Sequence, residues 1–111
     1  MIEFLIFQEL QERTGFPVYP KVPATLPDTF IVCQKTGSSL DNHIKTATFA
    51  IQSYGRNQDA AAVLNELVKE KMLSMIDLDE ISSVSLNGDY NYTDTQEKKD
   101  RYQAVFVITH Y

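Results

Sequence analysis

The stretch Ser85–Tyr111, SLNGDYNYTDTQEKKDRYQAVFVITHY, decides the fold, because it consists of two extended runs joined by a highly charged loop. In this first run, one side of the expected strand carries Val84, Leu86, Tyr90 and Tyr92, and polar residues occupy the opposite side. The second run, from Tyr102 onward, is apolar on both sides, which is typical of a strand covered on both faces. It reaches the last residue, so we expect the chain to end inside its own sheet. The stretch therefore predicts a β-hairpin with a polar arm.

Upstream of this hairpin, apolar residues at helical spacing from Ile2 onward predict a first helix. Gly15 suits the position just after a helix and Pro17 cannot continue one, so we expect this helix to end near Arg13 or Thr14. All four prolines fall between residues 16 and 28. Because this connector also carries aromatic and aliphatic residues, it should pack as a strap or a short edge strand.

Two central strands are expected after the connector. The first, residues 29–35, should break at 36–39, where Gly37 is a candidate turn glycine with a positive φ angle. The second strand, residues 43–54, should be closed by Gly55 acting in the same way. Alternate side chains of this second strand should face the core.

Asn57 is the expected N-cap of a long central helix with an acidic first turn. An apolar stripe along this helix should cover one face of the sheet, and it consists of Ala61, Leu64, Val68, Met72 and Met75. The order helix, strand, strand, helix, strand, strand predicts a single α+β domain over residues 1–111. We expect a mainly antiparallel four-stranded sheet packed by the N-terminal helix and the longer central helix.

The composition narrows the classes of function. A chain of 111 residues fits one domain, and its net charge of −5 argues against gripping nucleic-acid phosphates, which requires basic clusters. No stretch approaches the roughly 20 apolar residues of a membrane span, and the start lacks the basic region of a signal peptide. Cys33 is the one cysteine and fits a reducing compartment. We therefore expect a cytoplasmic protein without membrane contact.

Residues with reactive side chains are sparse. Cys33, His43 and His110 show no metal-ligand spacing, and the isolated glycines form no phosphate-binding loop. We expect Cys33 to be a buried, inert thiol; the alternative is a nucleophilic pair with one of the histidines. The acids at 77–80 suit a solvated turn better than an acid–base or metal site. The sequence therefore predicts no catalytic centre, no metal and no cofactor.

The six tyrosines, in a chain without tryptophan, have three possible roles. Tyrosine serves in protein cores, at protein interfaces, and as a platform on which bases stack. Base stacking needs a basic groove beside the rings, whereas the surroundings of Tyr90 and Tyr92 are neutral to acidic. We therefore favour core and interface roles over nucleic-acid binding.

Five short motifs carry a resemblance to a known family: Lys35-Thr36-Gly37, Asn42-His43-Ile44, Ala50-Ile51-Gln52-Ser53-Tyr54, Leu64-Asn65-Glu66 and Arg101-Tyr102-Gln103-Ala104. From about Phe30 to the end, the chain resembles small morphogenesis proteins of tailed phages and prophages. These proteins are encoded among the head–tail joining genes of Gram-positive siphophages. Within this group, the chain is most similar to the tail-terminator, or tail-completion, proteins of long non-contractile tails.

This resemblance implies a non-enzymatic α+β protein that forms a homo-oligomeric ring, typically a hexamer, on the end of the tail tube. Such a ring stops tube polymerisation and presents the surface that joins the head. The implied partners are other copies of the chain, the tail tube protein and a head-completion or connector protein, within the tail or neck of a virion assembled in the bacterial cytoplasm. DNA would pass through the lumen without specific binding, and we expect acidic side chains to line it.

Two alternatives remain beside this interpretation. One is a head-completion or minor capsid protein on the head side of the neck. The other is a small-ligand-binding α+β module or weak enzyme, which would need a concave site with convergent polar groups.

Two segments, the loop 37–42 and the hairpin arm 89–101, are predicted to make subunit or tube contacts. The candidate interface residues are Ser38, Ser39, Asp41, Asn42, Asp89, Tyr90, Tyr92, Asp94, Glu97, Lys98, Lys99 and Arg101.

Overall fold

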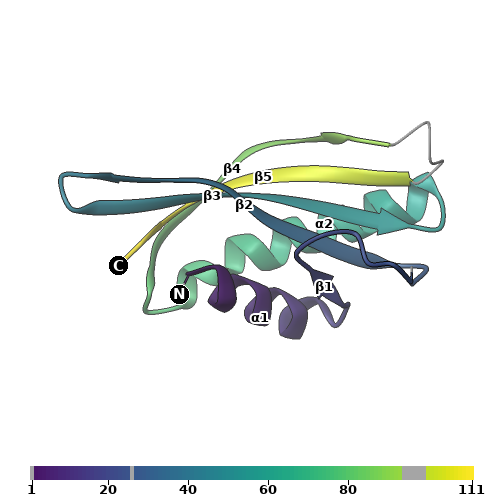
Figure 1. The fold of residues 1–111 in the computed structure, drawn as a ribbon, viewed down its shortest axis with the longest axis horizontal. Coiled ribbons are helices and arrows are strands. Elements are labelled where there is room, and N and C mark those ends of the chain that lie inside the picture. Colours follow the sequence, from purple (N-terminus) through teal and green to yellow (C-terminus); the bar gives the residue numbers. More distant parts are fainter. Residues whose placement is uncertain (1, 26, 94–99) are drawn as a thin grey trace.

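The molecule has two layers, a five-stranded sheet and two helices that both lie on one face of it (Figure 1). Alternation along the strands turns apolar side chains to that face, which the helices cover. The computed structural model describes residues 2–25, 27–93 and 100–111. In chain order the elements are α1 (Ile2–Thr14), β1 (Val18–Tyr19), β2 (Phe30–Asp41), β3 (Ile44–Gly55), α2 (Gln58–Ser74), a 3-10 turn (Met75–Asp77), β4 (Ile81–Asn91) and β5 (Asp100–His110).

The sheet has the order β1-β2-β3-β5-β4. Strands β2 to β5 form the predicted four-stranded antiparallel sheet, and β1 adds a fifth strand that runs parallel to β2. The prediction of an α+β domain is confirmed, whereas the strand number of four is wrong. The reason is the proline-rich connector, which pairs through the Pro17 carbonyl, an acceptor for the Ile31 N–H at 3.0 Å. The connector is thus the short edge strand that its composition predicted.

The first helix ends where the sequence predicts. Gly15 has a φ of 76°, and its N–H donates to the Gln11 carbonyl at 3.0 Å, which closes the last turn. On the buried side of α1, Ile6 and Leu10 are fully covered.

The β2–β3 hairpin differs from the prediction. Instead of breaking at 36–39, β2 continues to Asp41, and a register shift between Lys35 and Gly37 accommodates the extra residue. The turn lies at Asn42 and His43, whose φ angles are 48° and 66°. The expected positive φ of Gly37 is therefore wrong, because this glycine lies within the strand.

The central helix begins at its predicted cap. The Asn57 side chain accepts the Ala60 N–H at 2.8 Å, and the five predicted stripe residues of α2 and the following turn are all buried. Gly55 ends β3 as expected, but its φ is not positive. Its lack of a side chain instead allows the end of β3 to approach the start of α2, because a Cβ there would lie 2.5 Å from the Ala61 nitrogen.

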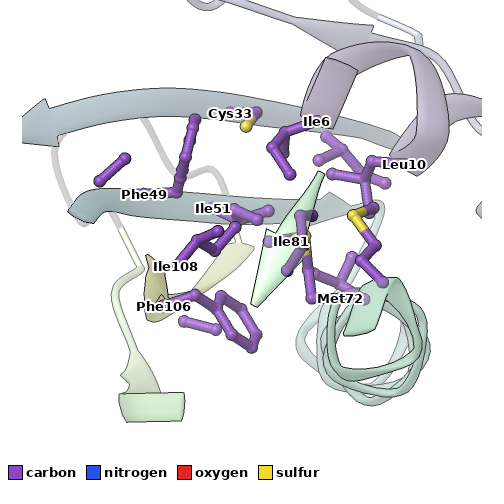
Figure 2. Packing of buried hydrophobic residues seen from close by; sticks show 14 of the residues in the cluster. Ile6, Leu10, Cys33, Phe49, Ile51, Met72, Ile81, Phe106 and Ile108 are labelled. Carbon is purple, nitrogen blue, oxygen red and sulfur yellow. The ribbon is translucent and has the colours of Figure 1, made fainter. Parts of the chain in front are cut away.

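The core lies between the sheet and the helices (Figure 2). Phe49 of β3 is directly opposite Phe106 of β5, and both are fully buried against residues of α1 and α2. The prediction that β5 is covered on both sides holds for one side only. Ala104, Phe106 and Ile108 are buried, whereas Val105, which points to the other face, is half-buried.

The end of the chain stays attached to the domain. β5 ends at His110, and the Tyr111 N–H donates to the Glu80 carbonyl at 3.1 Å. Neither helix in the described part of the chain is long and apolar enough to span a membrane.

Candidate assembly surfaces

One face of the sheet carries no helix among the described residues, and we call it the uncovered face (Figure 1). By strand alternation it presents the side chains of β2 to β5 that do not point into the core. Asp41 and Arg101 are its charged residues in the described strands, one at each end. Between them lie Gln34, Gly37, Ser39, Thr46, Thr48, Ala50, Gln52, Ser83, Ser85, Gly88, Tyr90, Gln103, Val105, Val107 and Thr109. The same face carries the exposed Ile44 beside Asp41 and a small buried cluster of Phe30, Val32 and Tyr54.

Arg101 holds together an aromatic cluster at one end of the uncovered face. Its Nη1 donates to the Tyr54 hydroxyl at 2.6 Å, and its Nε donates to the Tyr92 carbonyl, also at 2.6 Å. The guanidinium carbon lies 4.5 Å from the Tyr92 ring centre, a cation–π arrangement. The Tyr54 ring stacks on Phe30 with 4.4 Å between centres. The cluster therefore fixes the start of β5 against β3 and the end of β4.

A row of side-chain amides continues from this cluster across the sheet. Gln52 Nε2 donates to Gln103 Oε1 at 2.9 Å, and Gln103 Nε2 in turn donates to the Tyr90 hydroxyl. The Tyr54 hydroxyl donates to Gln52 Oε1 at 3.2 Å. These bonds satisfy polar groups of Gln52, Gln103 and Tyr90 within the face itself, and none of these three side chains carries a charge.

The sequence-predicted residues Tyr90, Tyr92 and Arg101 thus come together, but Asp89 does not join them. Its carboxylate points to the helix side of the sheet, where it accepts from Lys69 Nζ at 3.1 Å and lies 3.5 Å from Asn65 Nδ2. The nearby carboxylates raise the pKa of Lys69, first through the hydrogen bond to Glu66 and then through that to Asp89.

The other predicted group lies at the far end of the long axis, at the tip of the β2–β3 hairpin (Figure 1). Ser38, Ser39, Asp41 and Asn42 are exposed there, and the hydroxyl groups of Ser39 and Thr46 bond across the two strands. Sequence patterns did not identify two apolar residues of this tip, Leu40 and Ile44, which are 67% and 54% exposed. A large exposed apolar side chain on a hairpin tip is a candidate contact residue.

Both long edges of the sheet are open over much of their length. In the described residues, β4 pairs only with β5, so its outer edge has no strand partner. On the other side, β1 pairs with β2 at Ile31 and Val32, and no described residue pairs with the β2 edge from Gln34 to Asp41. Unpaired strand edges carry free N–H and C=O groups that can accept a strand from another chain.

The Cys33 thiol is buried, as the sequence predicts. It lies in β2 at 0% exposure, and burial raises its pKa to about 12. At neutral pH the group is therefore protonated and a poor nucleophile.

We expect native Cys33 to react with iodoacetamide at pH 8 more than tenfold more slowly than the same protein unfolded in urea, because the thiolate is the reactive form. Mass spectrometry after timed quenching measures the two rates. Equal rates would contradict the buried, protonated thiol and would reopen the nucleophilic alternative.

The acids at 77–80 are partly used within the fold. Arg13 Nη2 donates to Asp77 Oδ1 at 2.8 Å, and this bond lowers the pKa of that exposed carboxyl group. In the described part of the chain, no three His, Cys, Asp or Glu side chains come together as a metal-binding group. His43 and His110 do line one small hollow beside the hairpin tip, a proximity that sequence spacing could not indicate.

The surface also carries an open groove of about 480 Å³ beside the start of α2. Its lining is mostly apolar, with Phe16, Val63 and Leu67 among its residues, and Arg56 and Asp59 are its charged residues. A small-molecule site would need several convergent polar groups in an enclosed hollow, which this arrangement does not provide.

The structure thus places eight of the candidate residues in three places: the hairpin tip, the Arg101 cluster, and the helix side of β4. The remaining four, Asp94, Glu97, Lys98 and Lys99, lie outside the described residues. No protein-family model matches the sequence, and no curated protein is significantly similar to it.

Proposed function

We propose that this chain is a structural protein of a phage tail or neck that forms a ring at the end of the tail tube. The observation that carries the proposal is a sheet with helices on one face, an almost uncharged second face, and an open edge on each side. Such a unit has two different surfaces for its neighbours, which is the requirement for a head-to-tail ring. The resemblance of the sequence to tail-terminator proteins supplies the biological setting.

In this ring, the uncovered face lines the lumen and the helices lie outside. Apart from Arg101, whose guanidinium is already bonded to Tyr54 and Tyr92, the described lining of Gln, Thr, Ser and apolar residues offers DNA neither a cation for its phosphates nor a strongly repelling field. This differs from the acidic lining expected from the net charge of the chain, because Asp41 is the one acid of the described uncovered face. DNA would slide along neutral polar groups, of which Gln52 and Gln103 are already hydrogen-bonded to each other.

The ring stops tube growth by shape: one rim fits the last ring of tube subunits, and the other presents a different surface to the head. The described residues provide two such ends, the hairpin tip and the end that carries the Arg101 cluster, on opposite ends of a domain 44 Å long. The end that meets the tube depends on whether the protein lies on the tail side or on the head side of the neck.

Electron microscopy of particles from a bacterium in which this gene is deleted tests the proposal. Filled heads beside unattached, overlong tails are the expected result, because nothing would end tube polymerisation. Leaking or empty heads beside tails of normal length would place the protein on the head side of the neck instead. Normal particles would overturn both positions, and the groove near Val63 would then become the starting point for a ligand search.

A further inference from the structure

We propose that copies of this chain join by antiparallel pairing of the open edge of β2 in one copy with the open edge of β4 in the next, with Leu40 opposite Leu86 of the partner copy. The inference rests on the proposed function only in taking the partner to be a second copy of the chain. It names the surface through which the ring would close.

Strand direction is the first argument. Each neighbouring pair in the series β2, β3, β5, β4 is antiparallel, so β2 and β4 run in opposite directions. When β4 of one copy meets β2 of the next, the new pair is therefore antiparallel as well. The sheet then continues from copy to copy without a change of pattern, and each added pair has the more stable antiparallel ladder.

Two exposed leucines fix the register of this pairing. Leu40 on β2 and Leu86 on β4 are 67% and 39% exposed, and both point to the helix side of the sheet. A contact between them in the assembled sheet would bury two apolar side chains that one copy leaves in water. Directly opposite residues on antiparallel strands have Cβ atoms roughly 5 Å apart, close enough for such a contact.

The remaining pairs agree with this register. The shift in β4 between Leu86 and Gly88 skips one residue, so the pairs beside Leu40–Leu86 keep each side chain on its proper face. Residues of the uncovered face pair with residues of the uncovered face, and residues of the helix side pair with residues of the helix side. The pairs are Asp41–Ser85, Ser39–Gly88, Ser38–Asp89 and Gly37–Tyr90.

These pairs include five of the residues that the sequence predicts for the interface, although one copy holds them on opposite edges. Gly37 opposite Tyr90 is a favourable combination, because an aromatic side chain can lie over the space that a glycine leaves empty. Asp89 has Ser38 as its neighbour, so no two like charges are brought face to face.

The stagger between copies is the last argument. Within one copy, Leu86 lies level with Lys35 of β2, which is opposite Phe49 of β3. The proposed partner residue Leu40 is opposite Lys45, four residues from Phe49 along β3. This offset of about 13 Å over four strands that span about 19 Å tilts the strands by about 35°, a tilt typical of closed barrels. A hexamer closed in this way would be roughly 45 Å across at the backbone.

Disulfide trapping tests the contact. Under mild oxidation, the double variant Leu40→Cys/Leu86→Cys should give a ladder of linked copies on a non-reducing gel, because each copy carries both halves of the contact. Cys33 is buried in the folded chain and should not contribute. The matched control is Leu40→Cys/Val63→Cys, since Val63 is 69% exposed but belongs to α2 and not to an edge strand. A ladder no stronger than that of the control would overturn the pairing.

A second pair of variants tests the same contact without cysteine chemistry. Leu86→Lys should abolish ring formation in sedimentation experiments, because a charge at an edge opposes strand pairing, whereas Val63→Lys should leave it intact. Both positions are exposed, so circular dichroism should report a native fold for each. Rings formed by Leu86→Lys at the concentration that suffices for the native chain would overturn the proposal.

The two proposals fail separately. If the native chain sediments as a ring but the double-cysteine variant gives no ladder, the strand pairing is wrong and the neck function stands. If the ladder forms but deletion of the gene leaves particles normal, the pairing stands and the neck function is wrong.

Discussion

Gly55→Ala is expected to lower the free energy of unfolding by about 3 kcal/mol, at the upper end of the usual cost of overpacking. A Cβ at this position would lie 2.5 Å from the Ala61 nitrogen and 2.8 Å from the Ala60 carbonyl carbon. Both atoms belong to the backbone in the first turn of α2, which the Asn57 cap holds in place, so neither can rotate away. The end of β3 and the start of α2 would have to separate.

Urea unfolding followed by circular dichroism measures this loss. Gly88→Ala is the matched control, because, its chain neighbours aside, no described residue has an atom within 4 Å of a Cβ built there, and its φ is not positive. That variant should stay within about 0.5 kcal/mol of the native chain. Equal effects of the two substitutions would mean that β3 and α2 do not approach as closely as the structure places them.

Gly55 also illustrates how far sequence patterns reach. The sequence predicted correctly that a glycine ends this strand and that Asn57 caps the next helix, because both conclusions depend on neighbouring residues. It gave the wrong reason for the glycine, a positive φ. The actual reason is a close approach between two backbone segments, and that depends on how the helix packs on the sheet.

Gly37 shows the same limit in a strand. An isolated glycine beside serines is typical of a turn, and the sequence predicted a break there. In the structure β3 offers a partner to every residue of β2 from Lys35 to Asp41 except the one skipped at the register shift. Long-range pairing therefore outweighed the local preference, and the turn moved to Asn42.

The candidate surface was predictable in part. Runs of polar residues identified both hairpin ends, and Tyr92 and Arg101 do meet there. The prediction that Leu86 and Tyr90 share one side of the strand is wrong, because the register shift between Leu86 and Gly88 turns Tyr90 to the uncovered face. Sequence could not indicate that the half-buried Val105 lies on an uncovered face, or that Leu40 and Leu86 lie on opposite open edges. These facts follow from strand order, which alternation within single strands leaves undetermined.

The open edge at Leu86 lies in the same row of the sheet as buried core residues, so the folding of the domain and the pairing of copies depend on neighbouring positions. Leu86 is directly opposite Phe106, which is directly opposite Phe49, so the edge proposed for pairing is supported by the buried row beneath the helices. A change in that row should affect the folded domain, whereas a change at Leu86 should affect only the contact between copies. Substitutions along one row of the sheet can therefore separate the two properties.

Phe106→Ala is expected to cost about 4 kcal/mol of unfolding free energy, because it removes a fully buried ring and leaves a cavity that the flanking strands cannot fill. A domain of this size is usually stable by about 5–15 kcal/mol, so much of its stability would be lost. Phe106→Leu keeps most of the volume and should cost less than about 1.5 kcal/mol. Thermal and urea unfolding of the three proteins measure the series.

The control for the loss of a phenyl side chain is Phe4→Ala, since Phe4 is 68% exposed on α1. This substitution should change the free energy of unfolding by less than about 0.5 kcal/mol. In order of decreasing free energy of unfolding, we therefore expect the native chain and Phe4→Ala together, then Phe106→Leu, then Phe106→Ala. If Phe106→Ala unfolded within 1 kcal/mol of the native chain, the buried row would not be the core of the domain. The neighbouring edge at Leu86 would then lack the rigid support that pairing with a second copy requires.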